Sequence, residues 1–496
     1  MTSAKPDRPD RSKASGADFL QLDLNRAPTG RLAEWLAEEF RSAIGDGRLP
    51  VGARLPATRV LADELGISRG SVTEAYRRLA EDGQVSGRGR AGTVVQAAPV
   101  GIGVEPDHTA APVRVVGQPR FAEPDTTAFE QLRLAPARYD LTPGTPDLAS
   151  FPRTAWLRAE RAVLADAEPS DFGYADPRGT PTLRRAVAGW LARNRGIRAN
   201  PDDLIVVSGV AQALHLLGGL LGRRLDRIAV EDPGSLGARQ QFSAAGLDTA
   251  PTAVDEHGIR VDELDAGGAR AVMITPAHQF PTGVVLSGER RRDLLDWADR
   301  HNAMIIEDDY DAEHRYDRPP VAALQALRPE RVCYTGSVSK LLAPALRIGW
   351  LLAPPALAGE LVEAKRHADL GSSSLAQLVL ARMMINGELE RQLRFARRRH
   401  RARRDAMITA ITELLPDARI HGAAAGLHLM ITFDHRPDLD DVALADRMLD
   451  AGVKAQPLSW HRQQPGPPGL VLGYAATPTA PITEAIMIIG RLLGPK

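Results

Sequence analysis

Lys340 stands in a setting that suits amine chemistry. Gly336 and the hydroxyl residues Ser337 and Ser339 precede it, and Arg347 follows it by seven residues. Burial and neighbouring cations lower the pKa of a lysine, so that its amine can form a Schiff base with an aldehyde, while an arginine and hydroxyls can bind phosphate. An ordinary exposed lysine is the alternative, but only six of the 62 basic residues are lysines. Because nearly all basic residues of this sequence are arginines, a lysine among glycine and hydroxyl residues is unusual, which favours a chemical role for Lys340.

A second candidate for phosphate binding lies at the start of a predicted helix. Gly209, Val210 and Ala211 follow the short apolar run 204–207 and lead into that helix. Backbone amides at a helix N-terminus point outward and bind anions. Because glycine-containing turns between strands and helices are common, this stretch has weight only in combination with other residues.

Acidic residues and a phenol follow another apolar run, at 304–306. The stretch 307–311 reads Glu-Asp-Asp-Tyr-Asp, in which Tyr310 is the phenol. One carboxylate could hold a protonated ring nitrogen and the phenol a ring oxygen, but acid clusters at strand ends also bind Mg²⁺. A phosphate cradle, a carboxylate, a phenol and a Schiff-base lysine together describe a pyridoxal 5'-phosphate (PLP) site. We assign no residue as a metal ligand.

Six short apolar runs must position these residues. Several of them are separated by predicted helices. Unbroken short apolar runs are typical of strands buried on both faces, in a mostly parallel sheet covered by helices, and ligands bind such sheets at the carboxyl ends of the strands. The runs are residues 204–208, 227–230, 271–275, 304–307, 332–335 and 348–352.

The N-terminal part has a different pattern, of short amphipathic helices. Apolar residues at helical spacing predict a helix over 32–44, a short second helix, and a third helix capped by Ser68. The last two, joined by a tight glycine turn, form a helix-turn-helix. Residues 85–95 predict a hairpin with two arginines at its tip, and such a cationic wing can follow a phosphate backbone or enter a minor groove.

The first turns of the third helix carry Arg69, Ser71 and Thr73, which in this motif point at base edges in the major groove of DNA. The alternative is that the arginines of this region only solubilise a helical interaction domain. Residues 31–90 hold ten arginines against nine acids, so net charge does not decide between the two. The placement of the arginines favours binding to double-stranded DNA.

Length and composition indicate a soluble protein of two or three domains. The 496 residues are 44% hydrophobic and 25% charged, with a formal net charge of zero. The single cysteine, Cys333, excludes an internal disulfide and fits a reducing compartment. No apolar run is long enough to span a membrane, and the first residues lack a signal peptide. We therefore expect a cytoplasmic protein without membrane contact.

Changes in composition and periodicity predict the domain boundaries. Residues 1–29 are expected to form a disordered tail, because their first part is polar, charged and proline-bearing. Residues 30–96 form the winged helix. Residues 97–138 lack sustained periodicity and predict a linker, and residues 139–496 form the α/β domain with a small α+β lobe at its C-terminal end.

The N-terminal domain resembles the winged helix of the GntR family of bacterial regulators. The resemblance rests on Leu55-Pro-Ala-Thr-Arg59, Leu65-Gly-Ile-Ser-Arg69 and Asp82-Gly83, in the family's order and spacing. It implies DNA contacts at Arg59, Arg69, Ser71 and Thr73, and at the wing near Arg90. The wing departs from the family pattern at Arg90-Ala-Gly-Thr93, where Gly-x-Gly-Thr is usual.

The large domain is similar to the fold-type I aminotransferases. Their motif order is reproduced by Tyr174-Ala-Asp-Pro-Arg-Gly179, Ser208-Gly209, Glu231-Asp-Pro-Gly234, Pro281-Thr-Gly283, Asp308 with Tyr310, Lys340 and Arg347. The resemblance implies that Lys340 forms the Schiff base with PLP, that Asp308 pairs with the pyridinium nitrogen and that Tyr310 bonds the ring hydroxyl. The implied phosphate ligands are the backbone at Gly209, Val210 and Ala211 together with Ser337, Ser339 and Arg347.

A GntR winged helix joined to such a domain resembles the MocR subfamily of bacterial regulators, of which Pro143-Gly-Thr-Pro-Asp147 and His278-Gln-Phe-Pro281 are typical strings. The resemblance implies a homodimeric, DNA-binding transcription regulator. Its aminotransferase-like domain would sense PLP or a PLP-amine adduct, and it would control genes of vitamin B6 or of amine or amino acid metabolism.

Three departures from the aminotransferases bear on the effector. Ser235 replaces an aromatic residue, Phe280 replaces an asparagine for which His278 or Gln279 is the expected substitute, and Val471 replaces the arginine that binds a substrate carboxylate. Loss of that arginine argues against transamination of an ordinary amino acid. The alternatives are an active aminotransferase with a fused DNA-binding domain, and a large domain that has lost PLP and only dimerises. Retention of Lys340 with its predicted partners argues against the latter.

Overall fold

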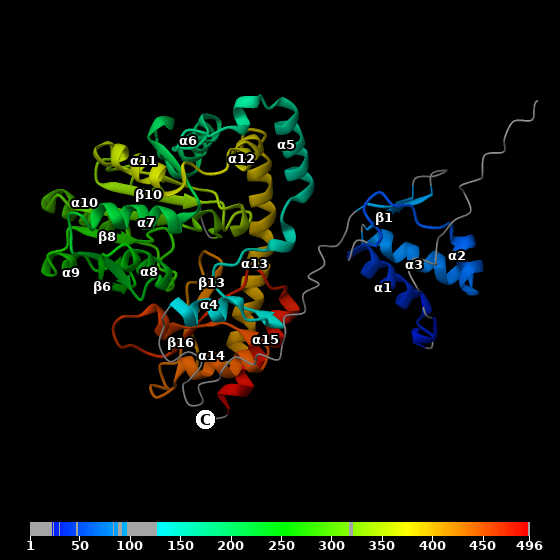
Figure 1. Ribbon diagram of the computed structural model, residues 1–496. Coiled ribbons are helices and arrows are strands. Elements are labelled where there is room, and N and C mark those ends of the chain that lie inside the picture. Colours follow the sequence, from blue (N-terminus) through cyan, green and yellow to red (C-terminus); the bar gives the residue numbers. More distant parts are fainter. Residues whose placement is uncertain are drawn as a thin grey trace, which may run out of the picture. The chain divides into compact units, whose positions relative to one another are not determined.

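The computed structural model describes residues 22, 24–28, 30–45, 48–82, 84–87, 92–96, 126–316 and 321–494. The chain divides into two compact units, Met1–Val116 and Gly117–Lys496. Figure 1 colours the helices of the first unit blue and runs through the second from cyan to red. Within the described residues, no helix combines the length and the apolar character that a membrane span requires.

Three helices and a short hairpin form the first unit. Helix α1 spans Leu32–Gly45, α2 spans Thr58–Leu65 and α3 spans Arg69–Glu81, and strands β1 (Val85–Gly87) and β2 (Thr93–Val95) pair antiparallel. Ser68 is the N-cap of α3, as predicted, because its side chain accepts a hydrogen bond from the backbone N–H of Ser71. Apolar side chains of the three helices share one core, in which the rings of Phe40 and Tyr76 meet edge to face at 5.6 Å. The predicted helix-turn-helix is confirmed.

An eight-stranded sheet is the centre of the second unit. The strand order is β4-β11-β10-β9-β8-β5-β6-β7. The pairs formed among β6, β5, β8, β9 and β10 are parallel, whereas β11 runs antiparallel to β10 and β4, and β7 to β6. The prediction of a mostly parallel sheet is therefore confirmed. The strands are β4 (Leu204–Val207), β5 (Arg227–Asp232), β6 (Asp248–Asp255), β7 (Gly258–Ile259), β8 (Ala271–Ile274), β9 (Met304–Asp309), β10 (Val332–Ser337) and β11 (Gly349–Leu352).

Helices cover both faces of this sheet, which is why its strands are apolar throughout (Figure 1). Ile205 and Val207 face the core under α7, α8 and α11, whereas Leu204 and Val206 face the core under α6 and α12. Farther along the sheet, α9 and α10 cover the second face. The helices are α5 (Arg153–Asp166), α6 (Pro181–Arg195), α7 (Val210–Leu221), α8 (Leu236–Ala244), α9 (Val261–Ala266), α10 (Gly288–His301), α11 (Pro355–Asp369) and α12 (Ser374–Ile385).

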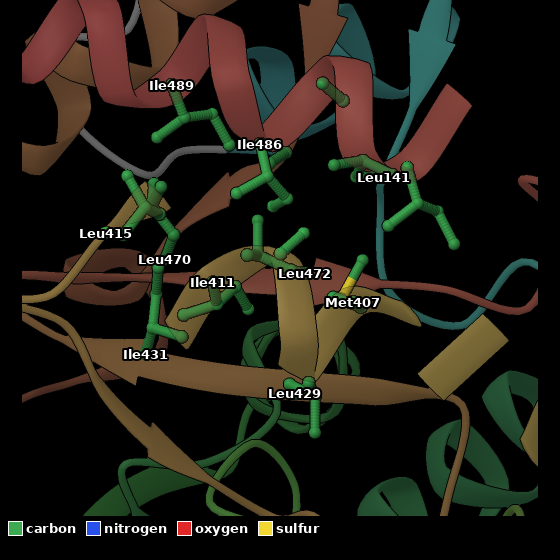
Figure 2. Packing of buried hydrophobic residues seen from close by; sticks show 14 of the residues in the cluster. Leu141, Met407, Ile411, Leu415, Leu429, Ile431, Leu470, Leu472, Ile486 and Ile489 are labelled. Carbon is green, nitrogen blue, oxygen red and sulfur yellow. The ribbon is translucent and has the colours of Figure 1, made fainter. Parts of the chain in front are cut away.

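The C-terminal lobe is a small antiparallel sheet packed on helices. Its strand order is β12-β13-β16-β15, formed by Arg419–His421, His428–Thr432, Gly469–Gly473 and Gln456–Pro457. Helices α13 (Glu388–Leu414), α14 (Asp441–Asp450) and α15 (Thr479–Leu493) complete it, and β14 (Val453–Lys454) pairs with β3 (Tyr139–Asp140). Figure 2 shows its core, where Met407 and Ile411 of α13 meet Leu472 of β16 and Ile486 of α15.

Part of the predicted linker is a helix, which corrects the expectation of a structureless stretch over 97–138. Helix α4 spans Thr126–Leu134, and its Ala128 and Leu132 are buried against Leu236 and Trp460. A nine-residue helix of this kind depends on docking to the rest of the fold, so its local periodicity is weak evidence. A 3-10 turn at Leu24–Arg26 also falls within the predicted tail. Residues 1–21 and 97–125 lie outside the described residues.

Candidate functional site

One cavity of about 330 Å³ in the second unit brings the predicted cofactor residues together. It lies where β9 and β10 end and α7 begins, and it is also lined by residues of α4, β15 and the 3-10 turn η9 (Leu458–His461). Gly209 adjoins Arg347 at the N-terminus of α7. The other eight predicted residues line the cavity: Val210, Ala211, Asp308, Tyr310, Ser337, Ser339, Lys340 and Arg347.

Asp308 differs from the other acids of the 307–311 cluster in having no cationic or backbone partner among the described residues. Its hydrogen bond there comes from the hydroxyl of Thr335, at 3.2 Å, which the parallel pairing of β9 and β10 sets opposite it. The remaining acids are engaged: Glu307 accepts from the backbone of Leu324, Asp309 from Arg195, and Asp311 pairs with His278. Asp308 is therefore the carboxylate available to a ligand.

Burial raises the pKa of Asp308 to about 7, from its ordinary value of 3.8. The neighbouring carboxylates of Asp309 and Asp311 act in the same direction, while Lys340 opposes them. A ligand with a protonated ring nitrogen would supply the missing cation. The carboxylate therefore suits such a ring better than a neutral one.

Lys340 follows the end of β10 by three residues and points its amine at the cavity wall. Its Nζ donates to the carbonyl oxygen of Gly144. Burial lowers the pKa of Lys340, although Asp311 and Asp308 partly offset it. A Cβ at Gly144, whose φ is +81°, would lie 2.9 Å from that Nζ, so the close approach requires glycine. The lowered pKa favours the neutral, nucleophilic amine.

The N-terminus of α7 and Arg347, which are predicted to bind phosphate, lie next to each other. Gly209 is the N-cap of α7 with φ +83°, and a Cβ on it would lie 3.1 Å from Nη1 of Arg347. Arg347 itself has a left-handed backbone, with φ 50°, and its guanidinium donates to the carbonyl of Ser208. Ser337 accepts a hydrogen bond from the backbone N–H of Ser339 at 3.3 Å. A guanidinium, two hydroxyls and the first amides of a helix are the donor set that a phosphate needs.

Tyr310 and Phe280 line the cavity beside one another, with ring centroids 6.1 Å apart. Burial and the neighbouring carboxylates raise the pKa of Tyr310 well above its ordinary value. Neither expected substitute for the missing asparagine is among the cavity-lining residues. His278 bonds Asp311 and Tyr310, and the side-chain amide of Gln279 donates to Glu231 and to backbone carbonyls.

The part of the cavity lined by α4, β15 and η9 is neutral. Among the described residues that line the cavity, only Lys340 and Arg347 are cationic. Burial lowers the pKa of His461 to about 3, so this imidazole is uncharged at neutral pH. Val471, at the position of the aminotransferase arginine, is buried in β16 with Met430. No described side chain in that part of the cavity carries a positive charge that could form an ion pair with a ligand carboxylate.

Several residues that line the cavity were not predicted from the sequence as ligand contacts, among them Gly144, Phe129, Gln456 and His461. Gly144 stands in a string typical of the MocR subfamily, which was the available signal for it. Phe129, Gln456 and His461 had no sequence signal, because α4, β15 and η9 reach the cavity only through the tertiary fold.

The first unit exposes most of its predicted DNA contacts. Arg59, Arg69 and Thr73 are exposed, and Ser71 is half-buried. Within the described residues neither Arg59 nor Arg69 has an ion-pair partner. By contrast, Arg77 and Arg78, farther along α3, pair with Glu74 at 2.6 and 3.0 Å. Arg90 lies outside the described residues.

Comparison with known proteins identifies both units. The family model for aminotransferase class I and II matches residues 139–487, and that for bacterial regulatory proteins of the gntR family matches residues 32–95. The probable rhizopine catabolism regulatory protein MocR of Rhizobium meliloti is 32% identical over 479 residues, which cover 94% of each chain. The HTH-type pyridoxine biosynthesis transcriptional regulator PdxR of Corynebacterium glutamicum is 31% identical, over 87% of this chain and 90% of that protein.

A solved enzyme structure resembles the second unit. LysN, the alpha-aminoadipate aminotransferase of Thermus thermophilus, superposes with a TM-score of 0.67 and 26% identity, over 74% of this chain and 94% of its own. That structure is complexed with N-(5'-phosphopyridoxyl)-L-leucine.

Proposed function

The chain belongs to the helix-turn-helix transcription regulators that join a gntR-family domain to an aminotransferase class I and II domain, and we propose that its large unit binds PLP and thereby controls DNA binding. The observation that carries this proposal is the convergence of Lys340, Asp308, Tyr310 and Arg347 on one cavity. The carboxylate of Asp308, which has no cationic partner among the described residues, is the most specific part of it, because a ring cation would supply that partner.

The residues present fit PLP group by group. Arg347, Ser337, Ser339 and the first amides of α7 would hold the phosphate, while Asp308 would pair with the ring nitrogen and Tyr310 with the ring oxygen. When bound, PLP supplies an aldehyde that combines with amines and a ring that withdraws electrons. The related LysN fold, complexed with a phosphopyridoxyl compound, supports the assignment.

The protein's own groups have distinct tasks at this site. Lys340, whose pKa is lowered by burial, would present its amine to an incoming aldehyde and would lose its proton more readily than an exposed lysine. The carboxylate of Asp308 would stabilise the proton on the ring nitrogen, and the resulting cation would neutralise the buried charge of the carboxylate. Tyr310, with its raised pKa, stays protonated and donates a hydrogen bond. The ring of Phe280 packs edge to face against that of Tyr310, with centroids 6.1 Å apart.

The cavity favours sensing over turnover of amino acids. A carboxylate substrate would find no free cation among the described lining residues, so it would lose a charge-assisted contact worth about 1.5–3 kcal/mol. We therefore propose PLP itself, or its adduct with an amine that lacks a carboxylate, as the effector. PdxR, named as a regulator of pyridoxine biosynthesis, is consistent with an effector of the vitamin B6 group.

Helix α4 provides a route from the cavity to the DNA-binding unit. Phe129 lines the cavity, and its ring lies 6.5 Å from that of Trp460, on the turn that also carries His461. The chain N-terminal to α4 leads to the DNA-binding unit. We propose that a ligand in contact with Phe129 changes the packing of α4, and that this change is the coupling that regulation requires.

The proposal is tested by DNA affinity of the full-length protein, measured on duplexes selected from random sequence, with and without PLP. Saturating PLP is expected to change wild-type affinity by about 5- to 150-fold. Lys340→Ala should bind the same DNA without responding to PLP. A wild-type affinity that is constant across the PLP titration would contradict the proposal.

Two arginine variants identify the DNA-binding surface in the same assay. Arg69→Ala should weaken binding by about 1–3 kcal/mol with or without PLP, because Arg69 is exposed and has no ion-pair partner among the described residues. Arg77→Ala is the matched control, since the guanidinium of Arg77 already pairs with Glu74 and Glu81.

A further inference from the structure

A buried chain of hydrogen-bonding groups lies behind Tyr310. Nδ1 of His278 is 2.9 Å from Oδ2 of Asp311 and 2.9 Å from the hydroxyl oxygen of Tyr310. His278 and Asp311 are each 1% exposed, so water does not compete for these contacts. Of the three side chains only that of Tyr310 lines the cavity. This series of hydrogen-bonding groups therefore runs from the buried carboxylate of Asp311 to the hydroxyl of Tyr310 at the cavity.

The partners of Nδ1 determine the direction of these hydrogen bonds. If Nδ1 carried no hydrogen, its lone pair would face the carboxylate of Asp311 at 2.9 Å with no proton between them. The hydrogen therefore sits on Nδ1, where it is shared between Asp311 and the oxygen of Tyr310. The hydroxyl oxygen of Tyr310 then accepts a hydrogen bond from the imidazole. Because Nδ1 already carries a hydrogen, it cannot accept one from the hydroxyl of Tyr310, whose hydrogen is available to an acceptor in the cavity.

Two glycines and a second imidazole fix the ring of His278. A Cβ at Gly426 would lie 1.9 Å from its Cε1, and a Cβ at Gly283 would lie 3.1 Å from its Nε2. The ring of His428 lies 5.1 Å away, between centroids. These contacts hold the ring in place, and the contacts of Nδ1 with Asp311 and Tyr310 keep that nitrogen, rather than Cδ2, on the Asp311 side.

We propose that His278, oriented by Asp311, is a positioning residue that directs the hydroxyl hydrogen of Tyr310 into the cavity, toward the ring oxygen of bound PLP. This inference rests on the proposed function. The orientation matters because Phe280, which stands where aminotransferases have an asparagine, lines the cavity with a side chain that cannot donate a hydrogen bond. Without the asparagine donor, the direction of the Tyr310 hydroxyl decides whether the ring oxygen receives a hydrogen bond.

Other titratable groups around Tyr310 are unchanged in a variant of His278. Besides Asp311, the groups that act on its phenol are Asp308 on β9, Glu231 on β5 and Tyr474 after β16. A variant at His278 therefore reports on the direction of the hydroxyl while those groups remain constant.

The test is a pH titration of the visible absorbance band of PLP bound to the full-length protein. A hydrogen bond from Tyr310 to the ring oxygen of PLP lowers the basicity of that oxygen. It also lowers the basicity of the Lys340 nitrogen bonded to PLP, because that nitrogen and the ring oxygen share one proton. In His278→Ala the pH midpoint should rise by about one unit and the Kd for PLP by about tenfold. Tyr310→Phe should show at least the same shift. The double variant should match Tyr310→Phe, because His278 acts only through the phenol.

Two further variants guard against a change in folding. His278→Asn puts an amide donor close to the position of Nδ1 and should restore the midpoint toward that of wild type. His301→Ala is the control, since His301 pairs with Asp265 at 2.6 Å on the protein surface, and it should change nothing. Melting temperatures of all variants show which of them are folded.

Several results would overturn the inference. Shifts that add in the double variant, or a wild-type midpoint in a folded His278→Ala, would refute it while leaving PLP binding intact. Stoichiometric zinc that is lost in His278→Asn would also refute it, because a metal on Nδ1 excludes the hydrogen there. A wild type with no visible band at any PLP concentration would refute the proposed function, and this inference with it.

Discussion

Asp308, which we propose binds the ring nitrogen of PLP, lowers the stability of the folded protein at neutral pH. Among the residues that the structure describes, its carboxylate has a hydroxyl partner but no cationic one, and burial raises its pKa to about 7. As pH rises, the unfolded chain therefore releases this proton before the folded one does. Stability is lost between the unfolded value of 3.8 and about 7, and it stays lower above that range.

This cost gives a prediction for the protein without PLP. At pH 8 we predict that Asp308→Asn melts a few degrees above wild type, because the amide removes the buried charge, and that the two converge near pH 4. The same variant should bind PLP more weakly. Calorimetry at both pH values measures the first effect, with the exposed Asp438→Asn as control. A lower melting temperature for Asp308→Asn at pH 8 would contradict this account.

At the residue scale, the sequence indicated the chemical types of the site better than their arrangement. Lys340 was recognisable because lysine is rare in this chain, and Arg347 because of its spacing. The choice of Asp308 among four acids rested on family resemblance. Its physical reason became visible only with the tertiary partners, since Asp309 pairs with Arg195 on α6 and Asp311 with His278 after β8.

At the scale of elements, the sheet was predictable and helix α4 was not. Short apolar runs identify strands buried on both faces, and all six predicted runs are strands of the large sheet. Helix α4 has two buried apolar residues, Ala128 and Leu132, whose partners Leu236 and Trp460 are distant in sequence. Local periodicity cannot reveal a helix that is stabilised mainly by such contacts.

The position of α4 leads to a prediction about its dynamics. We predict that saturating PLP slows amide hydrogen exchange several-fold in residues 128–134, because a ligand beside Phe129 holds the helix against Leu236 and Trp460. Exchange in α10, which has no residue at the cavity, should stay the same. Mass spectrometry of peptides from both helices measures the difference. Equal exchange in α4 with and without PLP would exclude it as the coupling element.

At the scale of the whole molecule, exposed apolar residues mark a face for the expected homodimer. Phe172, Tyr174 and Leu370 are 59%, 92% and 55% exposed and line one surface hollow. Large apolar side chains gathered in this way are typical of association surfaces. Two copies would then present two DNA-binding units to repeated or inverted half-sites.

Substitution at this face tests the dimer. Tyr174→Arg is predicted to raise the dimer dissociation constant at least tenfold, because it puts a charge where an aromatic side chain is buried on association. Phe395→Arg is the matched control, since Phe395 is 50% exposed on α13 and is not among the residues of that hollow. Sedimentation velocity over a concentration series measures both. If Tyr174→Arg sediments as wild type does, the dimer uses another face.

The central claim is that the large unit binds PLP through Lys340. Its most direct test is the absorbance spectrum of the purified full-length protein, with and without added PLP, for wild type and Lys340→Ala. We predict a visible band in wild type that is absent or shifted in the variant, because a covalent bond between PLP and the amine of Lys340 moves the absorbance away from that of the free aldehyde. Identical spectra for the two proteins, or no band in wild type at any PLP concentration, would contradict the account.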